Sequence, residues 1–211
     1  VIDKLLSMDI DVIASEDSHE HRNKALLQYS NVRLLKEGEG YSISFDGSEA
    51  DLIVGKHIKI HDLLPTRNDR WMPSEILSWV EGEDVSAPAR YWVSVSDVAS
   101  AIAIIVGEEI SIDSVNLCGR RKWSPFDSKA EFDMLWQRTQ QGQSGLFTSE
   151  VLFGHEISGM EAKPITANED IRPDLEPIQE LLIQITGEGW RPLVPFRTGL
   201  MQLIAGILEN K

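Results

Sequence analysis

The residues of this sequence best suited to metal or nucleophilic chemistry are its five histidines and its single cysteine. His19 and His21 would face the same way on a strand, and His57 and His61 have the i, i+4 spacing that aligns metal ligands on a helix. The first pair, however, lies in a polar stretch, and the second lies among β-forming residues, where this spacing brings no convergence. We therefore predict that these histidines are surface residues and that the chain has no metal site.

The cysteine, Cys118, is followed by Arg120 and Arg121 but has no histidine nearby that could activate it. It lies in an apolar run, which predicts a buried strand residue rather than a nucleophile. One cysteine allows neither an intrachain disulfide nor a multi-cysteine metal site. The sequence also shows no signal-peptide pattern and no apolar run of the roughly 20 residues that cross a bilayer, so we expect a cytoplasmic protein.

The formal net charge of −14, from 34 acidic and 20 basic residues, limits the classes of partner. Binding to nucleic acid requires clustered Lys and Arg that displace counterions from phosphates. Anionic membrane surfaces select for basic segments in the same way. We therefore expect neither nucleic acid nor a membrane as a partner.

Strands that alternate with helices must position any functional residues. Short β-rich runs predict strands at residues 11–14, 31–35, 41–45, 52–54, 58–60, 91–95 and 115–119. Helical spacing predicts helices at residues 1–8, 20–28, 72–80, 98–106, 127–140, 177–186 and 199–209. Ser96-Asp97, Asp127 and Thr198 are the expected N-caps, and Pro73 and Pro177 are expected in first turns. Residues 141–170 have no sustained period and predict loops and short strands. This alternation indicates an α/β fold with a mainly parallel sheet.

Four segments of the second half carry a resemblance to a known family. They are RYWVSVSDVASAI at residues 90–102, SVNLCG at 114–119, IRPD at 171–174 and GWRPLVPFRTGL at 189–200. In this order and spacing, they make the chain from about Pro65 onward resemble an extended short-chain dehydrogenase/reductase of the NAD-dependent nucleotide-sugar epimerase/dehydratase type.

The resemblance implies an incomplete Rossmann-like domain with a small C-terminal substrate-binding lobe. We expect the Rossmann-like remnant at residues 1–106 and the lobe-like region at residues 107–211, together forming one compact unit. A remnant sheet that lacks strands would expose an unpaired edge, so we also expect a homodimer.

The resemblance also implies substrate-binding residues. The family's arginines at the positions of Arg90 and Arg172 hold the diphosphate of the substrate, and guanidinium groups suit that geometry. The residues alone allow a second interpretation, in which both arginines form salt bridges. His61 lies near the family's substrate-contacting asparagine, although the segment here has become HDLLP.

The family uses NAD or NADP, and the acidic end of its second strand binds the adenosine ribose. By position that residue would be Glu16 or Asp17. The chain contains no Gly-x-x-Gly-x-x-Gly loop to hold the cofactor's phosphates, and Gly38 and Gly40 stand among acidic residues that favour a turn. We therefore expect no retained cofactor.

The family's catalytic pair, a tyrosine with a lysine four residues later, is also missing from the chain. The three tyrosines are followed at that distance by other residues: Tyr29 by Arg33, Tyr41 by Phe45 and Tyr91 by Val95. We therefore expect no catalytic residue and a homologue that binds a nucleotide-sugar without turnover. The alternative is a non-catalytic structural or partner protein derived from this fold.

Overall fold

The computed structural model describes residues 1–14, 34–35, 38–67, 71–85, 87–139 and 171–209. The predicted helix at residues 20–28, the acidic pair Glu16 and Asp17, and the segment 141–170 lie outside the described residues.

The described elements alternate less regularly than the sequence predicts, because β3 to β6 follow one another without a helix between them and the last described elements are all helices. The strands are β1 (Val12–Ile13), β2 (Leu34–Leu35), β3 (Ile43–Ser44), β4 (Leu52–Ile53), β5 (Ile58–Ile60), β6 (Leu63–Leu64), β7 (Val93–Ser94) and β8 (Val115–Leu117). The helices are α1 (Ile2–Leu6), α2 (Ser74–Val80), α3 (Val95–Gly107), α4 (Pro125–Trp136), α6 (Glu176–Thr186) and α7 (Phe196–Glu209). The α/β class is thereby confirmed.

Within the described residues, the four strand pairs are all parallel and each forms a short two-stranded sheet, which confirms the predicted parallel pairing. The pairs are β1 with β2, β3 with β4, β5 with β8, and β6 with β7. Between β5 and β6 the backbone of Asp62 has a φ of 50°, in the left-handed region. On either side of Asp62 the chain pairs with different strands: Ile60 of β5 pairs with Leu117 of β8, and Leu63 of β6 pairs with Val93 of β7.

The start of α3 differs from the predicted cap at Ser96-Asp97. The helix begins at Val95, and the side chain of Ser94 caps it by accepting a hydrogen bond from the amide of Ser96. Asp97 instead accepts hydrogen bonds of 3.0 Å from the amides of Leu193 and Val194. Asp97 therefore fastens a segment almost one hundred residues away onto the first turn of this helix.

Two further predicted caps were also wrong. Ser124, not Asp127, caps α4, and Pro125 takes the first helical position, where its missing N–H costs nothing. The last helix begins at Phe196 rather than after Thr198. Ser, Thr and Asp are all good N-caps, so where several lie close together the choice depends on tertiary packing.

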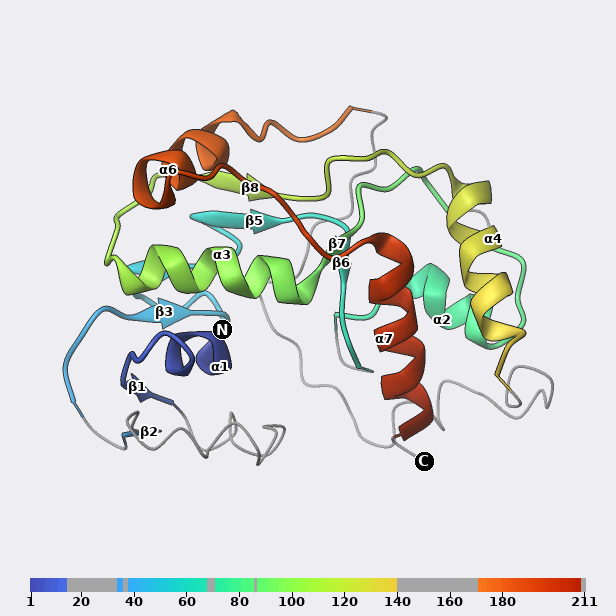
Figure 1. The fold of residues 1–211 in the computed structure, drawn as a ribbon, viewed down its shortest axis with the longest axis horizontal. Helices are drawn as coiled ribbons and strands as arrows, with labels where there is room; N and C mark the ends of the chain where they lie inside the picture. Colours follow the sequence, from blue (N-terminus) through green and yellow to red (C-terminus); the bar gives the residue numbers. More distant parts are fainter. Residues whose placement is uncertain (15–33, 36–37, 68–70, 86, 140–170, 210–211) are drawn as a thin grey trace.

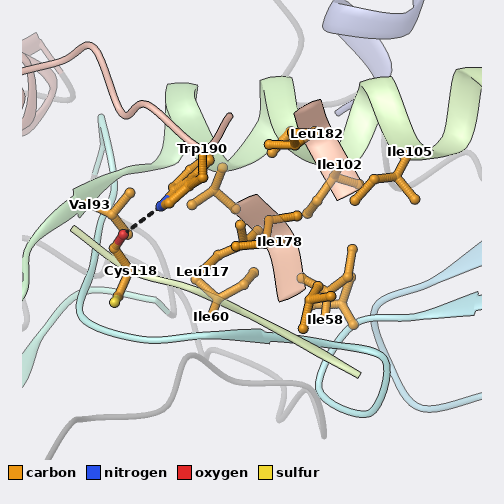
Figure 2. Packing of buried hydrophobic residues seen from close by; sticks show 14 of the residues in the cluster. Ile58, Ile60, Val93, Ile102, Ile105, Leu117, Cys118, Ile178, Leu182 and Trp190 are labelled. Carbon is orange, nitrogen blue, oxygen red and sulfur yellow. Dashed lines mark hydrogen bonds between the residues drawn. The ribbon is translucent and has the colours of Figure 1, made fainter. Parts of the chain in front are cut away.

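Among the described residues, the buried apolar side chains form two clusters. Figure 1 shows the helices of the first, α1, α3 and α6, in its left part and those of the second, α2, α4 and α7, in its right part. The first joins α1, α3 and α6 to β4, β5, β7 and β8, and the second joins α2, α4 and α7 around β6. Figure 2 shows part of the first cluster, where Ile102 of α3 and Ile178 of α6 meet Ile58 and Leu117 of the paired strands. Residues from either side of position 106 enter both clusters, so the two predicted regions share their core. Among the described helices, none is long and apolar enough to span a membrane.

Candidate functional site

A cavity of about 810 Å³ opens beyond the carboxyl end of β8, where open parallel sheets place their ligands. Three segments of the chain form most of its walls: the loop after β8, the segment that leads into α6 with the start of that helix, and the segment after α6; Tyr91, just before β7, adds one further residue. The lining residues are Tyr91, Arg120, Lys122, Ile171, Arg172, Pro173, Asp174, Leu175, Glu176, Gln179 and Trp190.

The loop after β8 presents Arg120 and Lys122 to the cavity. On one side, the amide of Gly119 donates to the carbonyl of Tyr91, and a Cβ at Gly119 would collide with the carbonyl oxygen of Trp92. On the other side, Trp123 and Arg90 exchange two main-chain hydrogen bonds, of 2.8 and 3.0 Å. Residues 120–122 therefore connect two segments that main-chain hydrogen bonds hold in place, and Arg120 and Lys122 lie at the edge of the cavity.

Arg121 lies between Arg120 and Lys122 in this loop but contacts Trp123 instead of the cavity. The guanidinium carbon of Arg121 lies 4.3 Å from the ring centroid of Trp123, a cation–π contact. Arg121 is not among the residues that line the cavity.

The segment before α6 contributes Arg172 and is fastened to the sheet through Asn116 of β8. The side-chain nitrogen of Asn116 donates a hydrogen bond of 3.0 Å to the main-chain carbonyl of Asp174. The carboxylate of Asp174 in turn accepts from the amide of Glu176 at 2.9 Å, which satisfies one of the free amides at the start of the helix. Leu175 is buried in the first core cluster.

Trp190 provides the apolar wall of the cavity. Its side chain is 3 % exposed, and its indole nitrogen donates a hydrogen bond of 2.9 Å to the carbonyl of Cys118 (Figure 2). This bond ties the segment after α6 to the end of β8.

The charges of the cavity contrast with those of the whole chain. Three cationic side chains, Arg120, Lys122 and Arg172, and two carboxylates, Asp174 and Glu176, line it, although the chain carries a formal net charge of −14. The lining residues therefore carry a formal net charge of +1 in a strongly acidic chain, and guanidinium groups suit phosphate oxygens geometrically.

Arg90 lies in the interior, and the contacts support the salt-bridge interpretation of this residue. Its Nε donates to Oε1 of Glu75 at 2.6 Å, and its Nη1 lies 3.3 Å from Oδ1 of Asp62. The three side chains are at most 6 % exposed. Arg90 is not among the residues lining the cavity, although its neighbour Tyr91 is. Of the two predicted arginines, the structure therefore brings only Arg172 to the cavity.

The predicted surface position was wrong for His61, whereas His57 is half-buried. His61 is 9 % exposed, and its Nε2 lies 2.9 Å from the side-chain oxygen of Asn116. His57 is half-buried, and its Nδ1 accepts a hydrogen bond from the amide of Ile53. His61 does not line the cavity itself; it reaches the cavity's wall through Asn116. The described residues include no group of three potential metal ligands.

Cys118, whose carbonyl accepts the indole hydrogen bond of Trp190, is buried and forms no disulfide. Burial, together with the negative charge of Asp62, raises the pKa of its thiol to about 12, although the positive charge of Arg172 acts in the opposite direction. The thiolate is the nucleophilic form, so this thiol is inert at neutral pH.

Sequence reasoning missed Arg120 and Lys122 as members of the site. The available signal was their spacing: they are two residues apart, immediately after a glycine that ends a predicted buried strand. In an α/β fold, that position marks the ligand-binding edge of the sheet. Glu16 and Asp17 lie outside the described residues, so their predicted cofactor role stays a prediction.

No protein-family model matches the chain, and no curated protein matches it. Among solved structures, it is similar in part to dTDP-glucose 4,6-dehydratase from Bacillus anthracis in complex with NAD. That match has a TM-score of 0.45 and 16% identity, and it covers 73% of this chain and 44% of the dehydratase. RMD from Pseudomonas aeruginosa, complexed with NADPH, matches with a TM-score of 0.40 and 12% identity over 73% of this chain and 47% of that protein. The matches thus span less than half the length of either solved structure.

Proposed function

We propose that this chain binds a nucleotide-sugar through its diphosphate, in the cavity between the loop after β8 and the start of α6. The observation that carries the proposal is the gathering of three cationic side chains around one cavity in a strongly acidic protein. Because the long-range field of the chain repels anions, a site for a diphosphate needs such a local concentration.

Each wall of the cavity has a role in this proposal. The guanidinium groups of Arg120 and Arg172 bind the diphosphate through charge-assisted hydrogen bonds, and Lys122 adds a point charge. Trp190 offers an apolar surface beside them, and the side-chain amide of Gln179 offers hydrogen bonds to hydroxyl groups. The arrangement resembles a binding pocket, in which a few polar groups stand among apolar ones.

In this proposal the chain binds its ligand without turnover. It contains no tyrosine followed four residues later by lysine, and the thiol of Cys118 is held protonated. Arg90 supports the fold through Glu75 and Asp62 and does not touch the ligand.

A second proposal, a homodimeric partner protein, has an observation of its own in its favour. Phe126 and Leu193 are each 80% exposed, and Ile171 is 75% exposed. Large apolar side chains at the surface are covered when two copies associate, and two-fold dimers are the commonest assembly. Under both proposals, the single buried cysteine is consistent with the cytoplasm as the compartment of the protein.

Calorimetric titration tests the binding proposal with UDP, dTDP and uridine. We expect both diphosphates to bind and uridine, which lacks the phosphates, to bind at least about tenfold more weakly, because charge-assisted hydrogen bonds contribute roughly 1.5–3 kcal/mol each. If neither diphosphate binds at millimolar concentration, the binding proposal fails and the partner-protein proposal remains.

A further inference from the structure

The three walls of the cavity are fastened to the fold in different ways. The loop after β8 is held by main-chain hydrogen bonds at both ends, through Gly119 and Trp123. The segment after α6 is held by the indole of Trp190 and by the carboxylate of Asp97. For the wall that carries Arg172, the side chain of Asn116 makes a polar link to the sheet within the described part of the chain.

The hydrogen bonds around Asn116 require a hydrogen on Nε2 of its neighbour His61. Because the side-chain nitrogen of Asn116 donates to the carbonyl of Asp174, its side-chain oxygen faces Nε2 of His61. Oxygen is an acceptor only, so Nε2 must carry a hydrogen and donate it. This donor exists in the neutral Nε2–H tautomer and in the doubly protonated ring alike.

We propose that His61 and Asn116 are positioning residues that hold the Arg172 wall of the cavity in its binding geometry. His61 is buried at the end of β5, so its ring is fixed by the sheet. It orients the amide of Asn116, and Asn116 fixes the carbonyl of Asp174, two residues from Arg172. The role of Arg172 as an anion ligand rests on the proposed function, whereas the positioning of the wall does not.

The link is specific to an amide at position 116. An aspartate has the same shape and would still accept the hydrogen bond of His61, but it cannot donate to the carbonyl of Asp174. Two oxygens would then face each other, and the wall would lose its attachment. At position 61, glutamine retains a side-chain N–H donor and leucine does not.

Hydrogen–deuterium exchange followed by mass spectrometry, without any ligand, tests the positioning directly. In Asn116→Asp we expect the amides of residues 174–179 to exchange about fivefold faster, the effect of losing one ordinary hydrogen bond. The amides of β5 and those of residues 189–194 should keep their wild-type rates. His61→Leu should show the same local pattern, and His61→Gln should restore slow exchange.

Asp97→Asn is the matched control, because it removes an acceptor from a different wall. An amide can replace only one of the two carboxylate oxygens that bind Leu193 and Val194. It should therefore speed exchange in residues 189–194 and leave residues 174–179 unchanged. Unchanged exchange of residues 174–179 in both Asn116→Asp and His61→Leu would overturn the proposal, and so would faster exchange spread over the whole sheet.

Titration of the same variants with UDP separates this inference from the proposed function. If the wild type binds UDP, Asn116→Asp and His61→Leu should bind at least about fivefold more weakly, and His61→Gln should bind as the wild type does. If the wild type binds no UDP while the exchange pattern holds, the positioning stands and the proposed function fails. If UDP binds all variants equally with unchanged exchange, the proposed function stands and the positioning fails.

Discussion

Arg90 and Glu75 form a buried ion pair in which Nε of the arginine donates to a carboxylate oxygen at 2.6 Å. Asp62 receives the other arm of the guanidinium at 3.3 Å and accepts the amide of Tyr91 through its second oxygen. Through Glu75 and Asp62, Arg90 joins α2 to the residue between β5 and β6, the two strands that pair with β8 and β7. Arg90, for which the family resemblance implies diphosphate binding, thus forms buried ion pairs within the fold.

Replacing Arg90 should therefore affect stability rather than ligand binding. Arg90→Ala removes the guanidinium that neutralises the buried carboxylates of Glu75 and Asp62, which costs about 3–5 kcal/mol and lowers Tm by roughly 6–20 °C in a chain of this size. Thermal denaturation followed by circular dichroism measures the change. Lys129→Ala is the control, because it breaks the partly exposed Lys129–Asp133 pair within one helix. It should cost only about 0.3–0.5 kcal/mol. Equal stability of both variants would contradict the structural role of Arg90.

Replacing the cations of the cavity should weaken ligand binding and leave the stability nearly unchanged. Arg172→Ala and Arg120→Ala should each weaken UDP binding about tenfold or more, since each removes charge-assisted hydrogen bonds. The Tm should barely move, because both side chains are exposed. Arg121→Ala is the matched control from the same loop, as Arg121 stacks on Trp123 outside the cavity. Its UDP affinity, measured by calorimetry, should equal that of the wild type. Weakening by all three variants alike would indicate a general charge effect.

Nicotinamide cofactors should not bind to this chain. The 211 residues contain neither the glycine fingerprint that cradles a pyrophosphate nor the tyrosine–lysine pair that uses the cofactor. Calorimetric titration with NAD and NADP should show no saturable heat. A dissociation constant in the low micromolar range, about −8 kcal/mol, would show that other residues hold the cofactor.

The thiol of Cys118 should be unreactive in the folded protein. Burial raises its pKa to about 12, so at pH 8 the reactive thiolate is nearly absent until the chain unfolds. A colorimetric thiol assay should detect almost no reaction in buffer and one equivalent in guanidinium chloride, because the chain has one cysteine. Rapid labelling of the native protein would mean that the end of β8 is open to solvent.

The chain should self-associate. Met201 of α7 and Leu193 just before this helix expose much of their apolar surface, which a second copy would cover. Light scattering after gel filtration, at tens of micromolar, should give twice the mass of 23.7 kDa. A single species at the monomer mass would contradict the dimer.

The sequence by itself predicted most of the described elements and their order, although it missed β6. The apolar run from Val98 to Val106 predicted a buried helix, and the helix predicted at residues 177–186 matches α6 to within one residue. The β-rich runs at residues 58–60 and 115–117 could be placed in a parallel sheet from the alternation of strands and helices alone. These features depend on local propensity and on hydrophobic period, which neighbouring residues encode.

Only the tertiary structure decided what the polar side chains do. Arg90 meets carboxylates 15 and 28 residues away, Asn116 meets Asp174 across 58 residues, and Asp97 meets Leu193 across 96. The family resemblance gives Arg90 and Arg172 the same role, yet Arg90 lies in the interior and Arg172 lines the cavity. A side chain's hydrogen-bond partners are chosen by which segments the packed core brings together, and no local pattern records that choice.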